Sequence, residues 1–381
     1  MKVLYDDAAF NQPYGGVAKY FTELIRNLPP GVEHDIAVRT SQCQYLWDEP
    51  FSVPKATHTF WNFWPWLRMR GKSYVYGFLA KTLRAIPSSE YENRRLFVEK
   101  LKRGDFDVLH ITDPHKYTFE WERVVGKKPV VMTVCDLIPD MDPKNEPLRK
   151  GRAKALRLAS HIIAISQHTR DDIIRMYGIE PEKISIVYLG HEDMRPNDSE
   201  IFPGMKYLLY VGGRRGYKNF AFFRDAIIPL MNDVLDLHLV CTGGKLSAEE
   251  MKPFIAAGVG DRVHSRFVET DEFPSLLSHA VCFVYPSKYE GFGIPIVDAF
   301  ACECPVVLSR CSCFPEIGGD AALYFDDGDG ESLRGHIRRL LYDSALRAEM
   351  IARGKARAEL FSWKKCAEET AQVYFKVLGF S

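Results

Sequence analysis

Short apolar runs alternate with amphipathic stretches along most of this chain. Val281 to Tyr285 is a continuous apolar run typical of a buried strand, and Pro286 and Ser287 end it. A helix is expected from Ile294, and a second apolar run, Val306 to Leu308, follows that helix. Strand, loop, helix and strand in this order form the βαβ unit of an open parallel sheet. Ligands of such sheets bind beyond the carboxyl ends of the strands, so the loops there are the first places to look for chemistry.

The same alternation extends over both halves of the chain. In the first half, we expect strands at 2–5, 107–111, 130–134, 161–165 and 183–189, with helices at 17–28 and 147–159. In the second half, we expect strands at 207–211, 238–241, 263–267, 281–285, 306–308 and 322–325, with helices from about 220, 247, 271, 294 and 363. The pattern predicts an α/β protein.

A polar segment at 191–204 separates these two series. It reads HEDMRPNDSEIFPG, and its charged residues and prolines are typical of a linker. We therefore predict an N-terminal domain at 1–192, a C-terminal domain at 193–361 and a last helix at 362–381.

Composition and charge exclude several classes of protein. The 381 residues are 46% hydrophobic and 13% aromatic, which suits packed cores and argues against disorder. Lys+Arg and Asp+Glu both number 50, so a nucleic-acid-binding surface is not expected. No apolar run approaches the roughly 18 residues that cross a bilayer, and the N-terminal MKVLYDDAAF is unlike a signal peptide. We expect a cytoplasmic protein.

The nine cysteines follow no regular framework, as expected in a reducing compartment. Cys302-x-Cys304 and Cys311-x-Cys313 resemble zinc ligand pairs. A strand between them would hold the two pairs roughly 20 Å apart, too far to share one ion. We therefore predict no metal site.

Residues 60–103 are aromatic and then basic. From Trp66 to Arg103 there are ten Lys/Arg and three Glu. Such a stretch can lie on an anionic membrane surface, on the inner face of the membrane. The alternative is that the tryptophans are core residues and the charges cover a solvated helix.

The loop after Tyr285 carries the first candidate site. Gly291 and Gly293, on either side of Phe292, allow backbone N–H groups up to Ile294 to approach a ligand, and Glu290 precedes them. Asp298 follows one helical turn later, so two carboxylates can accept hydrogen bonds from the hydroxyls of a sugar or ribose. The alternative is an ordinary strand–helix connection with solvated acids.

Two further glycine loops join a strand to a helix. Gly212-Gly213-Arg214-Arg215-Gly216-Tyr217-Lys218 combines glycines with three cations at a helix start, which is typical of an anion site such as one for a diphosphate. Gly15-Gly16 is a weaker signal, because a tight turn explains it equally well.

The run from Glu290 to Val307 resembles the donor-binding loop of retaining GT-B glycosyltransferases, family four (glycosyl transferases group 1). That family has Glu, seven residues and Glu, then a small-residue helix and a Pro-Val strand; here Asp298 replaces the second Glu. The resemblance implies two doubly wound Rossmann-like domains facing a cleft, the first for the acceptor and the second for the nucleotide sugar. It also implies that the last helix crosses back to the first domain.

The resemblance extends to single residues. It implies that Gly15 and Gly16 face the donor phosphate and the acceptor, and that Lys218 with Arg214 or Arg215 holds the diphosphate. Cys135 replaces the family's sugar-contacting His, while Asp136 matches and Ser166 begins a turn near the donor.

The resemblance implies a retaining hexosyltransferase for polysaccharide, O-antigen or capsule assembly. It would use a nucleoside diphosphate sugar and a glycan or lipid-linked acceptor, with no cofactor; GDP-mannose, UDP-hexose and dTDP-hexose are not distinguished. The catalytic candidates are Lys218, Arg214 and Glu290, and Asp298 would bind the ribose. The alternatives are a non-catalytic partner subunit, kept open by Cys135 and Asp298, and a sugar-nucleotide epimerase. A Rossmann-type oxidoreductase is disfavoured because no full Gly-x-Gly-x-x-Gly opens either half.

Overall fold

The computed structural model describes residues 1–56, 89–113, 118–191, 194–196, 198–268 and 271–380. The chain divides into two compact units, each with its own six-stranded sheet and core. The first unit comprises Met1–Ile165, Thr169–Val187 and Trp363–Ser381, and the second comprises Ser166–His168 and Tyr188–Ser362. Within the described residues, no helix combines the length and apolarity that crossing a bilayer requires.

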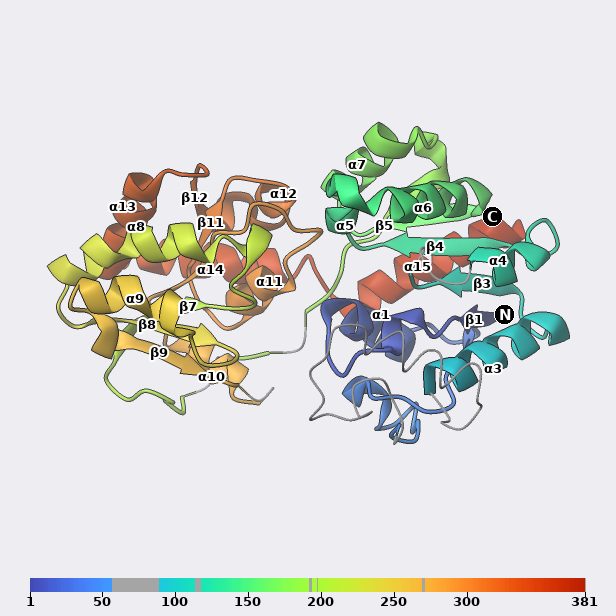
Figure 1. Cartoon of the computed structure of the whole chain (residues 1–381), viewed down its shortest axis with the longest axis horizontal. Coiled ribbons are helices and arrows are strands. Elements are labelled where there is room, and N and C mark those ends of the chain that lie inside the picture. The colour runs from blue at the N-terminus through green and yellow to red at the C-terminus, as the bar shows by residue number, and fades with distance from the viewer. Residues whose placement is uncertain (57–88, 114–117, 192–193, 197, 269–270, 381) are drawn as a thin grey trace. The chain divides into compact units, whose positions relative to one another are not determined.

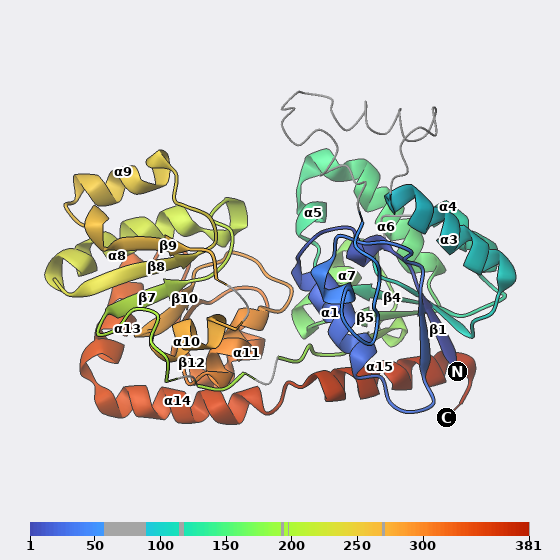
Figure 2. The ribbon, with the colours of Figure 1, turned by 90° about the horizontal axis from the view of Figure 1, so that it is seen from below.

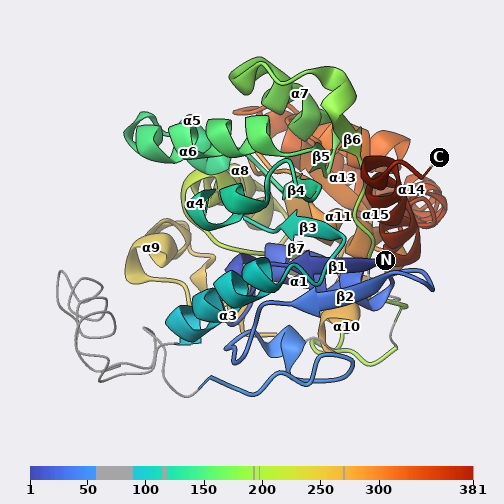
Figure 3. The same cartoon turned by 90° about the vertical axis from the view of Figure 1, so that its right-hand side faces the viewer.

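The sheet of the first unit is entirely parallel, and Figure 3 labels its strands in their spatial order. That order is β2 (Glu33–Ile36), β1 (Lys2–Tyr5), β3 (Val108–Ile111), β4 (Val130–Val134), β5 (His161–Ala164) and β6 (Ile184–Ile186). Strand β2 was not predicted, because the polar sequence EHDI lacks an apolar run. Its backbone pairs with β1 nonetheless, since edge strands need little apolar surface.

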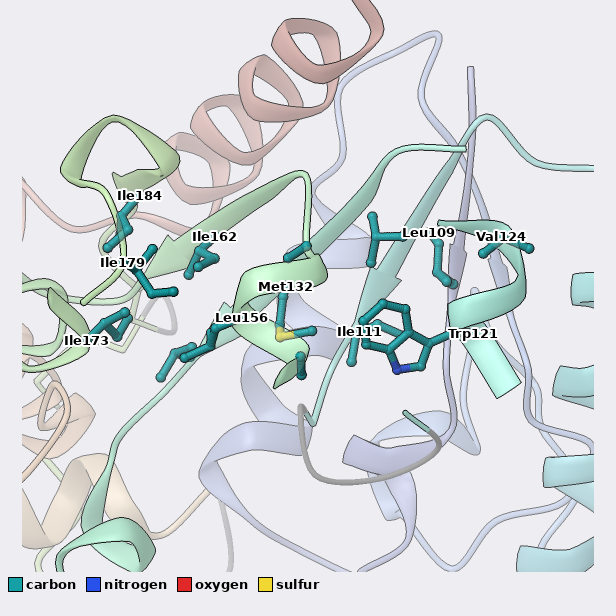
Figure 4. Close-up of a cluster of buried hydrophobic side chains, with 14 of the residues drawn as sticks. Leu109, Ile111, Trp121, Val124, Met132, Leu156, Ile162, Ile173, Ile179 and Ile184 are labelled. Carbon is teal, nitrogen blue, oxygen red and sulfur yellow. The ribbon is translucent and has the colours of Figure 1, made fainter. Parts of the chain in front are cut away.

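One face of this sheet carries an apolar core (Figure 4). Leu109, Ile111 and Met132 pack there against Trp121 and Leu156. The helices that cover this face are α3 (Ser89–Arg103), α4 (Thr118–Trp121), α6 (Glu146–Leu158) and α7 (Gln167–Tyr177). The short α5 (Ile138–Met141) follows the exit from β4.

The opposite face is covered by the first and last helices of the chain, which lie side by side (Figure 2). These are α1 (Gly16–Arg26) and α15 (Trp363–Leu378). Because residues alternate along a strand, Tyr5, His110 and Thr133 point to this face while their neighbours enter the apolar core. The C-terminal helix is thus part of the first unit.

The second unit has a parallel sheet in the Rossmann order, and Figure 1 labels all of its strands except β10. Its strands run β9 (Val263–Arg266), β8 (Leu237–Thr242), β7 (Lys206–Tyr210), β10 (Cys282–Tyr285), β11 (Val306–Ser309) and β12 (Ala322–Phe325). One face packs against α8 (Phe220–Asp233), α9 (Ala248–Ala256) and α13 (Gly330–Tyr342). The other helices of this unit are α10 (Phe273–Ser278), α11 (Ile294–Ala301), α12 (Phe314–Gly318) and α14 (Ser344–Ala358).

The strand order of each sheet reverses at one point, where consecutive connections leave toward opposite faces. In the first unit this point lies between β1 and β3, and in the second between β7 and β10. Loops that follow such strands are splayed apart, so a ligand can enter between them. The predicted doubly wound α/β architecture is confirmed, and the two reversal points locate the sites to examine. The predicted cleft between the two units remains a prediction.

Candidate active site

The loops after β7 and β10 bring two predicted residues together. Lys218 Nζ donates hydrogen bonds to Glu290 Oε1 at 2.7 Å and to Tyr285 Oη at 3.0 Å. The side chains of Lys218 and Glu290 are only 19% and 11% exposed, so water screens their attraction weakly. Burial raises the pKa of Tyr285 well above its usual value, so this phenol stays neutral beside the lysine. The pair stands at the strand-order reversal point of the second unit.

Backbone geometry fixes the position of the Glu290 loop. Gly293 has φ +90°, in the left-handed region, and forms the N-cap of α11. A Cβ there would lie 2.9 Å from Ile296 Cδ1 and 3.1 Å from Phe314 Cε1, so only glycine fits. Pro295 follows in the first turn of α11, and Asp298, 3% exposed, lies in the same helix. The predicted contact of Asp298 with a ribose stays a prediction.

A cysteine-rich turn after β11 supports the same loop. Ser312 Oγ accepts a hydrogen bond from Glu290 N at 3.0 Å, and Cys313 Sγ donates to the Glu290 and Phe292 carbonyls at 3.2 Å. Cys311 Sγ donates to Ser287 O at 2.8 Å. Burial raises the pKa of Cys313 well above its usual value, so its thiol keeps the proton it donates. Sequence reasoning considered these cysteines only as zinc ligands and missed this support.

The two arginines of the Gly212–Lys218 loop have different environments. Arg214 Nε donates to Glu250 Oε1 at 3.0 Å, and its Nη2 donates to the Gly244 and Lys245 carbonyls at 2.9 and 3.1 Å. Arg214 thereby ties the β7 loop to the start of α9. Arg215 is exposed and has no ion-pair partner among the residues that the structure describes. The geometry therefore leaves Arg215, rather than Arg214, ready for an added anion.

A pocket of about 660 Å³ lies between the loops that follow β7 and β8. Its lining is rich in glycine backbone and in cations, with Glu250 as the acid: Gly212, Gly213, Arg214, Arg215, Tyr217, Lys218, Thr242, Gly243, Gly244, Lys245, Ser247 and Glu250. Two of its four cations are already paired, Arg214 with Glu250 and Lys218 with Glu290, while Arg215 and Lys245 have no ion-pair partner among the described residues. The pocket is therefore suited to an anion of high charge, such as a diphosphate.

The first unit has a second pocket, of about 350 Å³, at its own reversal point. Gly15 and Gly16 at the start of α1 line it together with Cys135 and Asp136. Their predicted contacts with donor and acceptor stay predictions. Burial raises the pKa of Cys135 well above its usual value, and the Asp136 charge adds to this rise. A neutral thiol is a poor nucleophile, so this environment does not favour Cys135 as a nucleophile. Ser166, fully buried directly after β5, does not line this pocket.

Sequence reasoning missed a buried arginine at the edge of this pocket. Arg152, on α6, is 5% exposed and lines the pocket. Its Nη1 lies 2.5 Å from Asp140 Oδ2 and donates to the Asp136 carbonyl at 2.8 Å. Arg152 therefore fixes the turn that carries Asp136. Arg152 lies within the helix predicted at 147–159, and only its place on the packed side of α6 distinguishes it from the other basic residues there.

Most of the aromatic and basic stretch at 60–103 lies outside the described residues. In the described part, α3, several cations have acidic partners: Arg94 pairs with Glu120, Lys100 with Asp35, and Arg103 with Glu99. These pairs lower the charge that this helix can offer to a membrane. The membrane contact stays a prediction.

Two family models cover almost the whole chain. The model described as Glycosyltransferase Family 4 matches residues 14–194, and the model described as Glycosyl transferases group 1 matches residues 191–357. The chain belongs to the group 1 glycosyltransferases. This confirms the predicted family and the prediction of a sugar-transferring enzyme.

Individual relatives agree with this assignment. O-antigen chain mannosyltransferase B of Escherichia coli is 30% identical over 252 residues, which cover 62% of this chain and 66% of the relative. The MMP alpha-(1->4)-mannosyltransferase of Mycolicibacterium hassiacum is 27% identical over 323 residues, covering 73% of this chain and 72% of the relative.

Solved structures show the same fold. Anabaena Alr3699/HepE, in complex with UDP and glucose, superposes with a TM-score of 0.73 at 17% identity over 98% of this chain and 99% of that chain. Sucrose-phosphate synthase from Thermosynechococcus elongatus gives a TM-score of 0.71 at 19% identity, over 100% of this chain and 99% of that one. The predicted GT-B fold of this glycosyltransferase is thereby confirmed.

Proposed function

We propose that this chain is a retaining hexosyltransferase. It moves a hexose from a nucleoside diphosphate sugar to a glycan or lipid-linked saccharide acceptor. The observation that carries the proposal is the contact of Lys218 with Glu290, beside a cation-lined pocket at the reversal point of the second sheet.

Each group has a distinct role in the proposed reaction. The bond from the sugar's anomeric carbon to the diphosphate oxygen breaks, a new bond to an acceptor oxygen forms, and the proton of the acceptor hydroxyl passes to the departing diphosphate. Lys218 and Arg215 neutralise the charge that grows on the departing diphosphate. The backbone N–H groups from Gly291 to Ile294 add hydrogen bonds to it. Glu290 accepts hydrogen bonds from the sugar hydroxyls, and Asp298 from the ribose.

The names of the relatives narrow the choice of donor sugar. Escherichia coli mannosyltransferase B and the Mycolicibacterium enzyme are both named as mannosyltransferases, which favours a mannosyl donor. HepE was solved with UDP and glucose, which supports a nucleotide sugar as the class of ligand. We therefore propose a nucleoside diphosphate mannose as the first donor to test and an O-antigen type saccharide as the first acceptor.

Transfer assays on the purified chain test this function. GDP-mannose, UDP-glucose and a dTDP-hexose are each incubated with and without saccharide acceptors, and nucleoside diphosphate release is measured. We expect nucleoside diphosphate to be released only when an acceptor is present. We also expect the anomeric configuration of the product, read by proton NMR, to match that of the donor.

Other results would replace the proposal. An inverted product would overturn retention, and a free epimer formed without acceptor would show an epimerase. Donor binding, seen as a thermal shift, with no transfer to any acceptor would favour a non-catalytic partner subunit. If no nucleotide sugar raised Tm or was consumed, the proposed function would be wrong.

A further inference from the structure

A chain of buried polar side chains links the C-terminal helix to the pocket of the first unit. Tyr5 Oη lies 2.9 Å from Tyr374 Oη, and Tyr374 Oη lies 2.5 Å from His110 Nδ1. His110 Nε2 lies 2.9 Å from Thr133 Oγ1, which lies 3.2 Å from Tyr20 Oη. All five side chains are at most 1% exposed.

The five side chains of this network carry five polar hydrogens, but only four hydrogen bonds join them. Burial lowers the pKa of His110 to about 3, so its neutral ring carries one N–H. Burial also raises the pKa values of the three tyrosines, so each keeps its hydroxyl hydrogen. With the Thr133 hydroxyl, five hydrogens serve four contacts. One hydrogen must therefore find an acceptor outside the network.

The position of that extra hydrogen depends on the tautomer of His110. If Nδ1 carries the hydrogen, Nε2 accepts from Thr133, and the extra hydrogen belongs to Tyr5 or Tyr374. No described residue offers either tyrosine a further acceptor within hydrogen-bonding distance. A buried donor without an acceptor is costly, so this arrangement is disfavoured.

In the other tautomer, which is protonated at Nε2, the extra hydrogen can point out of the network. Tyr5 donates to Tyr374, Tyr374 donates to His110 Nδ1, and His110 Nε2–H donates to Thr133 Oγ1. Tyr20 donates to the same oxygen, because no other described residue offers the buried Tyr20 hydroxyl an acceptor within hydrogen-bonding distance. Both lone pairs of Thr133 Oγ1 are then filled. The hydrogen of Thr133 remains, and Thr133 is the member of the network that lines the pocket.

We propose that Thr133 donates a hydrogen bond to an oxygen of the sugar acceptor in the first unit's pocket, and that Tyr374 and His110 are positioning residues that hold Thr133 in this orientation. The ligand class rests on the proposed function. Asp113 and Asp136, which line the same pocket, supply acceptors beside this donor. A neutral donor among carboxylates suits a polyhydroxylated ligand, whose hydroxyls both give and take hydrogen bonds.

The tautomer of His110 is the direct test. In the full chain labelled with 15N-histidine, two-bond proton–nitrogen correlations distinguish a ring protonated at Nε2 from one protonated at Nδ1, and a His110→Asn variant assigns the signal. We expect Nε2–H in the wild type. We also expect Tyr374→Phe, which removes the donor to Nδ1, to give a mixture of both tautomers. An Nδ1–H ring in the wild type would overturn the proposal, whatever reaction the enzyme performs.

Kinetics test the role of Thr133. At saturating donor, Thr133→Val is expected to lower kcat/KM for the acceptor about tenfold, as expected for one lost hydrogen bond. Thr133→Ser restores a hydroxyl and is expected to stay within about threefold of wild type. Tyr20→Phe is the matched control, because it removes a buried hydroxyl from the network while Thr133 keeps its hydrogen.

The outcomes separate this proposal from the proposed function. If the serine variant is as impaired as the valine variant, or if Tyr20→Phe matches the valine variant, the loss is one of packing and the proposal fails. If the wild type transfers no sugar, the proposed function fails, and the His110 tautomer still decides the direction of the network.

Discussion

Lys218 is paired with Glu290, and in the proposed reaction a bound diphosphate would compete for its charge. Its ammonium group already has an acid at 2.7 Å and a phenol at 3.0 Å, both on or next to the loop that follows β10. A lysine held in this way is in place before a ligand arrives, so little reorganisation is needed during the reaction.

Removing this cation is the first residue-scale prediction. Lys218→Ala is expected to lower kcat by roughly a hundredfold or more, the effect of losing one preorganised charge stabiliser. Steady-state transfer assays measure it. Lys206→Ala is the matched control. Lys206 begins β7, its side chain is 60% exposed, and it pairs with Asp236. Turnover near that of wild type in Lys218→Ala would remove Lys218 from the mechanism.

The two neighbouring arginines are expected to respond differently to substitution. Arg215→Ala is expected to raise the donor KM severalfold with an unchanged Tm, because Arg215 is exposed and pairs with no other described residue. Arg214→Ala is expected to lower Tm as well, since it leaves Glu250 without its partner, at a cost on the order of 1–3 kcal/mol. Thermal melts and donor titrations on both variants measure these effects. Equal losses of Tm would contradict this division of roles.

At the scale of elements, the order of strands decides which loops meet. The loops after β7 and β10 are far apart in sequence, yet β7 and β10 are neighbours in the sheet. Strand positions were mostly predictable because buried strands are apolar runs: β4 and β12 fall where the sequence placed them. Strand β6 is shorter than the predicted 183–189, because only Ile184–Ile186 pairs with β5.

The junction between the Glu290 loop and α11 provides a test at this scale. Gly293→Ala is expected to weaken donor binding and to cost about 1–3 kcal/mol of unfolding free energy, because of its positive φ and the short contact with Ile296. Urea unfolding and donor titration measure the two effects. Gly335→Ala is the control, since Gly335 is exposed within α13 and has open space around it. There we expect a gain of up to about 1 kcal/mol. Similar results for both variants would rule out the steric argument.

At the scale of the whole molecule, the chain returns to its first unit at its very end. Helix α15 packs on the sheet face that carries Tyr5 and His110, and it contributes Trp363, Cys366 and Tyr374 to the buried residues there. The first unit is therefore incomplete without helix α15.

Truncation tests this dependence. Removing residues 363–381 is expected to expose the face under α15 and to lower the Tm of the first unit by more than 10 °C, or to leave it unfolded, since several large apolar side chains lose their cover. Calorimetry and limited proteolysis measure the effect. A chain shortened only by residues 379–381 is the control, because Gly379 and Phe380 lie beyond α15 and are exposed. An unchanged melting profile after the longer deletion would contradict the role given to α15.

The sequence by itself determined the α/β class and the loops that carry Lys218 and Glu290, because buried strands, glycine turns and helix starts are local in sequence. Only the tertiary structure decided how the side chains pair. In the tertiary structure Arg214 pairs with Glu250, whereas Arg215 remains exposed. Cys313 hydrogen-bonds to the Glu290 loop. Tyr374 contacts His110, which in turn contacts Thr133. These contacts connect residues distant in sequence, and their partners depend on strand order and on which side of each strand a residue faces.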